Sequence, residues 1–220
     1  PIRYNQSIAS AQVKSCLILA ALFIDGESTF YEITPTRDHT ENLLEHFNYN
    51  IDRSKNSLTF KGRQSLIAKD IDIGSDISSA AFFIVAAMIV DGSELLFRNI
   101  NINIYRTGLI TVLKNMGGDI DITNTKLISN ELVADIRVKY SNLKCIHIDG
   151  EIIPSLIDEL PVLFIACALA SGKSIRSGIE ELRHKESDRI KSMEEGLKSI
   201  GINVKSTKDS IEITGGKISG

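Results

Sequence analysis

The sequence repeats one pattern three times, and this internal repeat constrains the fold more than any other feature. An apolar run ends each time in a turn with a small or acidic residue before glycine, at Asp25-Gly26, Asp91-Gly92 and Ser171-Gly172. Each turn leads into a short run typical of a β-strand and then to an arginine. Self-similarity of this kind predicts a fold built from repeated supersecondary units.

The arginines Arg37, Arg106 and Arg189 each precede an amphipathic helix that ends at a turn signal. Two short alternating segments, typical of a β-hairpin, follow each helix. The predicted unit is therefore β-α-β-α-β-β, about 70 residues long and present three times. We expect the units to span residues 1–68, 69–143 and 144–220.

The first helix of each unit is apolar nearly all round, over residues 13–24, 80–90 and 162–170. A helix that is apolar on every face is buried on every face. The sequence thus predicts an α/β (α+β) fold of inside-out βαβαββ repeats, with parallel helices buried in the centre and sheets outside. On this prediction, a charge introduced at Leu19 or Phe83 should unfold the protein.

Composition excludes several classes of partner. The formal net charge of -3 and the sequence pI near 5.9 provide no electrostatic footprint for nucleic acid or an anionic membrane, so an anionic ligand needs a local basic cluster. The longest apolar run, residues 80–90, is far shorter than the roughly 20 residues of a membrane span. The three cysteines lack metal-ligand spacing, so we expect neither disulfides nor zinc, and a cytoplasmic location.

An acidic pair, Asp158-Glu159, lies between Pro154 and Pro161 before the third apolar run. One interpretation is ordinary capping of the helix that follows. The other is functional, because apolar surroundings disfavour the charged form of a carboxylate and raise its pKa toward the range of general acid–base chemistry.

A dense charged cluster covers residues 183–189, Arg-His-Lys-Glu-Ser-Asp-Arg, and opens the second helix of the third unit. Lys185 and Arg189 are four residues apart and are predicted to share a helical face, which Glu186 can also reach. The cluster is either a solvated, self-paired turn or an anion clamp at a helix N-terminus.

Further polar groups sit where other predicted helices begin. Ser10 and Gln12 open the first buried helix, Thr36 is a candidate cap before Arg37, and Asp76 stands at the same point of the second unit with no basic residue nearby in sequence. Each is open to a plain capping role. Parallel helices would gather their positive ends at one surface, where we expect an anionic substrate to bind.

Six motifs, in this order along nearly the whole chain, resemble those of the 5-enolpyruvylshikimate-3-phosphate (EPSP) synthases, the 3-phosphoshikimate 1-carboxyvinyltransferases of the shikimate pathway. The segments ASAQVKS and TRDHTE resemble the bacterial class with reduced glyphosate sensitivity more than the plant and enteric class. The motifs are SIASAQVKS, TRDHTE, GSDISSAAF, RTGLI, IDELP and LRHKESDR.

The resemblance implies six βαβαββ units in two lobes, with helices inside. It implies transfer of the enolpyruvyl group of phosphoenolpyruvate to the 5-hydroxyl of shikimate 3-phosphate, with release of phosphate, as a step of aromatic amino acid (chorismate) biosynthesis. It implies no metal or organic cofactor, a cytoplasmic protein that is monomeric at full length, and a site for glyphosate.

For the acceptor shikimate 3-phosphate, the resemblance assigns the phosphate to Ser10, Ala11 and Gln12, together with Arg37 and Thr36.

The resemblance also assigns roles at the reacting centre. Asp158 would bind the shikimate hydroxyls and act as general base, and Lys185 would contact those hydroxyls and the reacting centre. Glu186 would exchange a proton with the methylene carbon of phosphoenolpyruvate. Arg189 would hold the anionic donor, to which Gln12 also contributes.

The chain departs from the family in length, since members are about twice as long, and several family motifs are absent. Missing are the amino-terminal Lys-Ser motif, the NAGT-type loop with its later arginine, the DHR motif and the lysine near the carboxyl end; residues 38–40 read DHT. We therefore expect a central fragment that is inactive alone: residues 1–68 would be the last unit of the first lobe, and the rest two units of the second. Alternatives are a UDP-N-acetylglucosamine enolpyruvyl transferase and a non-catalytic fragment that binds phosphate-bearing ligands.

Overall fold

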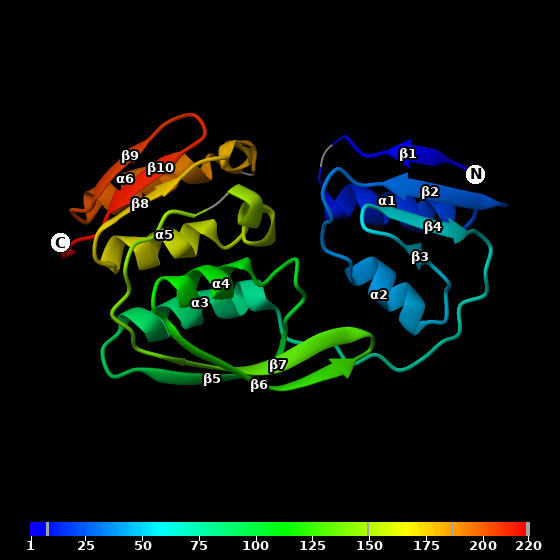
Figure 1. Ribbon diagram of the computed structural model, residues 1–220, viewed down its shortest axis with the longest axis horizontal. Coiled ribbons are helices and arrows are strands. Elements are labelled where there is room, and N and C mark those ends of the chain that lie inside the picture. The colour runs from blue at the N-terminus through cyan, green and yellow to red at the C-terminus, as the bar shows by residue number, and fades with distance from the viewer. Residues whose placement is uncertain (8, 149, 186, 219–220) are drawn as a thin grey trace. The chain divides into compact units, whose positions relative to one another are not determined.

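The computed structural model describes residues 1–7, 9–148, 150–185 and 187–218, and its contacts divide the chain into two units (Figure 1). The first unit comprises residues 1–74 and 126–133. The second comprises residues 75–125 and 134–220.

A four-stranded sheet and two helices make up most of the first unit. The strand order is β1-β2-β4-β3; β1 runs parallel to β2, and the other pairs are antiparallel. A small apolar core, including the stacked rings of Phe30 and Phe60, joins the sheet to the helices. The elements are β1 (Arg3–Asn5), α1 (Ala11–Ala21), β2 (Glu27–Tyr31), α2 (His39–His46), β3 (Asp52–Arg53) and β4 (Ser57–Lys61).

The tip of a β-hairpin completes the first unit. The side chains of His39 and Asn42, on α2, lie 2.8 and 3.2 Å from the carboxylate of Glu131. The amide of Asn130 donates to the backbone carbonyl of Asn42 at 3.1 Å. These contacts hold residues 126–133 against α2, while the remainder of the hairpin belongs to the second unit.

The second unit contains two further copies of the repeated pattern. The first copy has α3 (Ile77–Ile89), β5 (Glu94–Asn101), α4 (Gly108–Asn115), β6 (Asp119–Ile128) and β7 (Glu131–Lys139). The second copy has η1 (Gly150–Ser155), α5 (Leu160–Leu169), β8 (Lys173–Arg176), η2 (Glu180–His184), α6 (Arg189–Ser199), β9 (Asn203–Ser206) and β10 (Ile211–Thr214).

All three copies share one strand order, which confirms the predicted repeat. β5-β7-β6 and β8-β10-β9 match β2-β4-β3 of the first unit. The initial strand of the pattern is shortened in the second unit to single parallel bridges, Ser75 to Ile100 and Lys144 to Ser171. Each bridge occupies the place that β1 takes beside β2.

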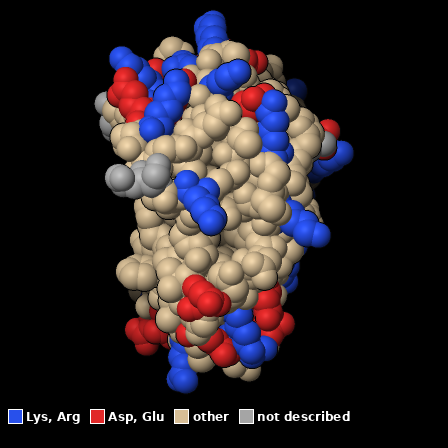
Figure 2. All heavy atoms as spheres, turned by 90° about the vertical axis from the view of Figure 1, so that its left-hand side faces the viewer, with Lys and Arg blue, Asp and Glu red and all other residues tan. Residues whose placement is uncertain are grey.

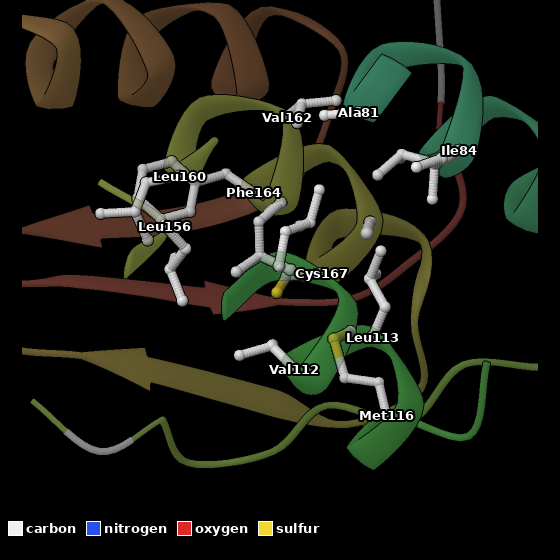
Figure 3. Packing of buried hydrophobic residues seen from close by; sticks show 14 of the residues in the cluster. Ala81, Ile84, Val112, Leu113, Met116, Leu156, Leu160, Val162, Phe164 and Cys167 are labelled. Carbon is white, nitrogen blue, oxygen red and sulfur yellow. The ribbon is translucent and has the colours of Figure 1, made fainter. Parts of the chain in front are cut away.

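α3, α4 and α5 lie between the two sheets of the second unit, as the predicted inside-out arrangement requires (Figure 1). α5 has no charged residue, and nearly every side chain along it is buried in one large core that also takes in α3, α4 and α6. Figure 3 shows how side chains of α3, α4 and α5 meet in this core. On the face in Figure 2, acidic residues gather at the upper and lower ends, and basic residues lie at both ends and across the middle.

The prediction that every first helix is buried on all faces is correct for α5 and wrong for α1 and α3. In α1, Leu19 is 49% exposed, and only Lys14, Ile18 and Ala21 are buried, a single stripe at helical spacing. In α3, Phe83 is 63% exposed. Because these side chains fill no part of the core, a charge at Leu19 or Phe83 is not expected to unfold the chain.

Two further features concern the described ranges only. No helix there combines the length and the apolarity that crossing a membrane demands. No group of His, Cys, Asp and Glu side chains in those ranges is arranged to hold a metal ion.

Candidate functional site

The start of α1 presents the first group of predicted site residues. Ser10 is the N-cap, and its hydroxyl accepts the backbone N–H of Val13 at 3.3 Å, so the capping role is confirmed. Gln6 braces the turn by donating to the Ser10 carbonyl at 2.7 Å. Ala11 and Gln12 follow as the first residues of the helix, with the Gln12 side chain exposed. Helix starts of this kind direct N–H groups and a positive dipole end toward an anion.

The segment that carries Thr36 and Arg37 lies beside the start of α1. The ammonium of Lys14 donates to the Thr36 carbonyl at 3.2 Å, and the hydroxyls of Ser15 and Thr40 are 2.6 Å apart. The structure thus brings the two predicted phosphate-binding segments of the first unit together. Arg37 is half-buried.

Thr36 does not cap α2, in contrast to the sequence-based prediction. The N-cap is Asp38, while the Thr36 hydroxyl donates to Glu32 Oε1 at 2.6 Å and its backbone N–H donates to the same oxygen at 3.1 Å. Thr36 lies two residues before that N-cap, and Glu32, just after β2, accepts both of its donors.

A polar network in the second unit joins the starts of α3 and α5. Glu159 is the N-cap of α5, only 5% exposed, and its carboxylate accepts the hydroxyl of Ser78 on α3. Arg106, just before α4, donates to Ser78 and pairs with Asp76 at 2.9 Å. Asp76 has no basic residue nearby in the sequence, but the fold brings Arg106 beside it.

The two carboxylates of this network have opposite pKa shifts. Burial raises the pKa of Glu159, and the hydrogen bond from Ser78 and the charge of Arg106 offset only part of that effect. Burial also acts on Asp76, but hydrogen bonds from the side chain and backbone of Ser79, with the Arg106 charge, outweigh it and lower the pKa. Of the acidic pair, Glu159 is the buried member.

Asp158 points toward the start of α6. Its Oδ1 lies 3.8 Å from Nη1 of Arg189, the first residue of that helix, and its side chain is 36% exposed. The predicted acceptor base and the predicted donor clamp are thus neighbours. The contact is a partly solvated ion pair, so it leaves both groups accessible to ligands.

The predicted helical face of Lys185 and Arg189 is not formed. η2 ends at His184, Lys185 is extended, and α6 begins only at Arg189, with Asp188 as its N-cap. Lys185 instead pairs with Glu181 at 2.6 Å. Glu186, the predicted proton donor, lies outside the described residues.

Sequence reasoning missed the residues that anchor these segments. Lys14 pairs with Glu41 at 2.7 Å and with Glu32 at 3.2 Å, and all three side chains are nearly fully buried. One signal could have found them: Lys14 is the single lysine of an apolar helical run. Burial of such a lysine would require an acidic partner, because a buried ammonium must be paired. Ser78 and Arg106 were noted only as parts of helix starts.

Two surface hollows lie away from these residues. One, of about 250 Å³, is lined by Ile89, Tyr140 and Leu169 among others; the second, of about 500 Å³, is lined by Glu45, Tyr49 and neighbours. None of the predicted site residues lines either hollow. The candidate site residues of each unit are therefore polar groups at helix starts and do not line an enclosed pocket.

Comparisons with known proteins agree with the motifs. The chain is 48% identical to 3-phosphoshikimate 1-carboxyvinyltransferase of Hydrogenovibrio crunogenus, over 98% of this chain and 49% of that protein. It is 46% identical to the protein of that name from Methylococcus capsulatus, over 100% of this chain and 50% of the relative. It therefore spans about half the length of the curated relatives it matches.

A solved structure of EPSP synthase from Acinetobacter baumannii superposes with a TM-score of 0.92 at 45% identity, covering 98% of this chain and 49% of that one. The family model described as EPSP synthase (3-phosphoshikimate 1-carboxyvinyltransferase) matches residues 1–220. The resemblance in the six motifs is thereby confirmed, and the chain belongs to the EPSP synthase family.

Proposed function

We propose that this chain forms part of an enzyme that transfers the enolpyruvyl group of phosphoenolpyruvate to the 5-hydroxyl of shikimate 3-phosphate and releases phosphate. The observation that carries the proposal is the match of the whole chain to the EPSP synthase family, with relatives at 46–48% identity named for this activity. Residues 1–68 would be the last unit of one lobe, and residues 69–143 and 144–220 two units of the other.

The first unit supplies the site for the phosphate of the acceptor. Ser10, Ala11 and Gln12 offer a hydroxyl, backbone N–H groups and an amide at the positive end of α1. Thr36 and Arg37 approach from the adjoining segment, where the guanidinium adds the positive charge that the net charge of -3 does not provide.

The second unit supplies the chemistry of addition. Asp158 accepts the proton of the 5-hydroxyl as its oxygen bonds to C2 of phosphoenolpyruvate, and Glu186 delivers a proton to the methylene carbon. In the elimination that follows, the methyl carbon gives back a proton and the bond from C2 to the phosphate oxygen breaks. Lys185 and Arg189 balance the negative charge of the donor and of the leaving phosphate, with Gln12 contributing to the donor.

Asp158 is held for this role by its neighbour. Glu159 is anchored through Ser78 to Arg106, so the first turn of α5 is fixed to the starts of α3 and α4. The proposed reaction needs no cofactor, since both reacting groups arrive on substrates. We also propose that the full-length protein is a cytoplasmic monomer with a site for glyphosate.

We expect the 220-residue chain alone to be inactive, because family motifs that complete the donor site are absent from it. Phosphate release should be followed with both substrates, with Asp158→Ala as the matched control. Product above the Asp158→Ala level would refute the prediction of inactivity and place a sufficient site within these residues.

Substrate identity is tested by binding. In a ¹⁵N–¹H correlation spectrum, shikimate 3-phosphate should shift the backbone signals of Ala11 and Gln12, whereas UDP-N-acetylglucosamine should not. A response to the UDP-sugar alone would indicate the sister transferase. Equal shifts with inorganic phosphate would indicate a fragment that binds phosphate without recognising the acceptor.

A further inference from the structure

One buried cation lies directly behind the phosphate-binding segments of the first unit. Lys14 is the only charged residue of α1 and is 2% exposed, although its neighbours Val13 and Leu19 face solvent. Burying an ammonium is costly unless it is paired and hydrogen-bonded. Here it is both, and its partners come from three segments of the unit.

Lys14 and one of its partners, Glu32, both bind Thr36. Its Nζ lies 2.7 Å from Glu41 Oε1 on α2, 3.2 Å from Glu32 Oε1 and 3.2 Å from the carbonyl oxygen of Thr36. The same Glu32 oxygen accepts the backbone N–H and the hydroxyl of Thr36. All three hydrogen-bonding groups of Thr36 are thus held by two ions that also pair with each other.

This arrangement fixes the peptide that leads into Arg37. With its N–H and carbonyl both held, Thr36 has little freedom, so the backbone of Arg37 starts from a defined position. Lys14 also donates its own N–H to the carbonyl of Ser10 at 3.1 Å. That backbone bond belongs to the first turn of α1, so the ammonium of Lys14 links the helix that Ser10 caps to the Thr36 carbonyl.

Stability alone is a weak explanation for the cluster. Replacing a buried ion pair with apolar side chains is often neutral or stabilising, so burial of charge does not by itself stabilise a fold. Burial also raises the pKa of Glu41, against the opposing effect of Lys14. A costly group that joins α1 to α2 and to the Glu32–Thr36 loop suits a role in geometry.

We propose that Lys14 is a positioning residue: with Glu32 and Glu41 it holds the Thr36–Arg37 peptide against the start of α1, so that the site for the substrate phosphate is formed before the substrate binds. This inference rests on the proposed function for the identity of the ligand. The inference that Lys14 holds the Thr36–Arg37 loop in place is independent of the proposed function.

The loop is tested first without ligand, by amide hydrogen exchange in the 220-residue chain. Lys14→Met should lower protection at Thr36 and leave protection at Phe30 and Leu58, in the neighbouring strands, unchanged. Lys55→Met, at an exposed turn of the same unit, removes the same charge and should change neither. Unaltered protection at Thr36 in a folded Lys14→Met variant would overturn the proposal.

Binding is tested next by titrating shikimate 3-phosphate while following the amides of Ala11 and Gln12. Lys14→Met should weaken the affinity at least about tenfold, and Lys55→Met should not. If the unaltered chain shows no binding while the exchange result is as expected, the proposed function fails for this chain and the ligand assignment with it, whereas the loop-holding role of Lys14 stands.

A second variant separates positioning from folding. Lys14→Met combined with Glu41→Leu removes the Lys14–Glu41 pair, while Glu32 keeps its hydrogen bonds from Thr36, and should keep the unit folded even if Lys14→Met alone does not. A residue needed only for folding predicts that this double variant binds as the unaltered chain does, and that result would overturn the proposal. Positioning predicts a folded double variant that still binds about tenfold more weakly.

Discussion

Two phenylalanines in apolar helices offer the sharpest test of which helix faces form the core. Phe164, in α5, is fully buried, and Figure 3 shows it among side chains of α4 and α5. Truncating a buried Phe to Ala removes its transfer free energy and leaves a cavity, at a cost of about 3–5 kcal/mol. Since a domain is stable by only about 5–15 kcal/mol, Phe164→Ala should remove a large share of the stability of the second unit.

Phe83→Ala is the matched control. It makes the same chemical change in α3, but the side chain is 63% exposed, so no cavity forms and the cost should stay within about 0.5 kcal/mol. Urea unfolding followed by far-ultraviolet circular dichroism is the suitable assay, because the chain has no Trp for fluorescence. Equal losses for the two variants, or a larger loss for Phe83→Ala, would refute the assignment of the core.

Three other substitutions test separate parts of the structure. Because the folded state raises the pKa of Glu159 above 4.5, the unaltered chain should lose stability relative to Glu159→Gln as pH rises above that value; a flat difference in urea titrations from pH 4 to 8 would contradict this. Gly62→Ala places a Cβ 2.0 Å from the carbonyl oxygen of Ile24 and should destabilise the first unit by about 1–3 kcal/mol in the same titrations. Gly196→Ala, on the exposed face of α6 with open space around it, should raise stability by up to about 1 kcal/mol, and a loss there would argue against the helix.

The repeat was predictable because its signals are local. Turn residues such as Gly26 and Gly172 take a positive φ, so glycine at those points marks the end of each first helix. Which apolar faces of each helix are buried by other parts of the chain was not predictable. Apolarity shows that a face avoids water, but it does not distinguish a face covered within these 220 residues, such as that of Phe164, from one that is not, such as that of Phe83.

The sequence nominates residues for the candidate site but does not give their contacts. Helix starts and charged motifs drew attention to Asp158 and Arg189, which do lie together. The bond between Ser78 and Glu159 joins residues 81 positions apart, and no spacing rule connects them. The prediction of a shared helical face for Lys185 and Arg189 failed because it assumed one continuous helix, whereas Lys185 and the N-cap Asp188 are both extended.

The hairpin tip at residues 126–133 has a consequence for any attempt to divide the protein. The chain passes from one unit to the other at residues 74–75, returns at 125–126 and passes back at 133–134. A protease cut near residue 74 therefore leaves the hairpin tip of the first unit on the other piece of the chain. A shortened gene ending at residue 74 would produce a first unit whose α2 lacks its contacts with Asn130 and Glu131. The first compact unit of this molecule is therefore not a contiguous stretch of sequence.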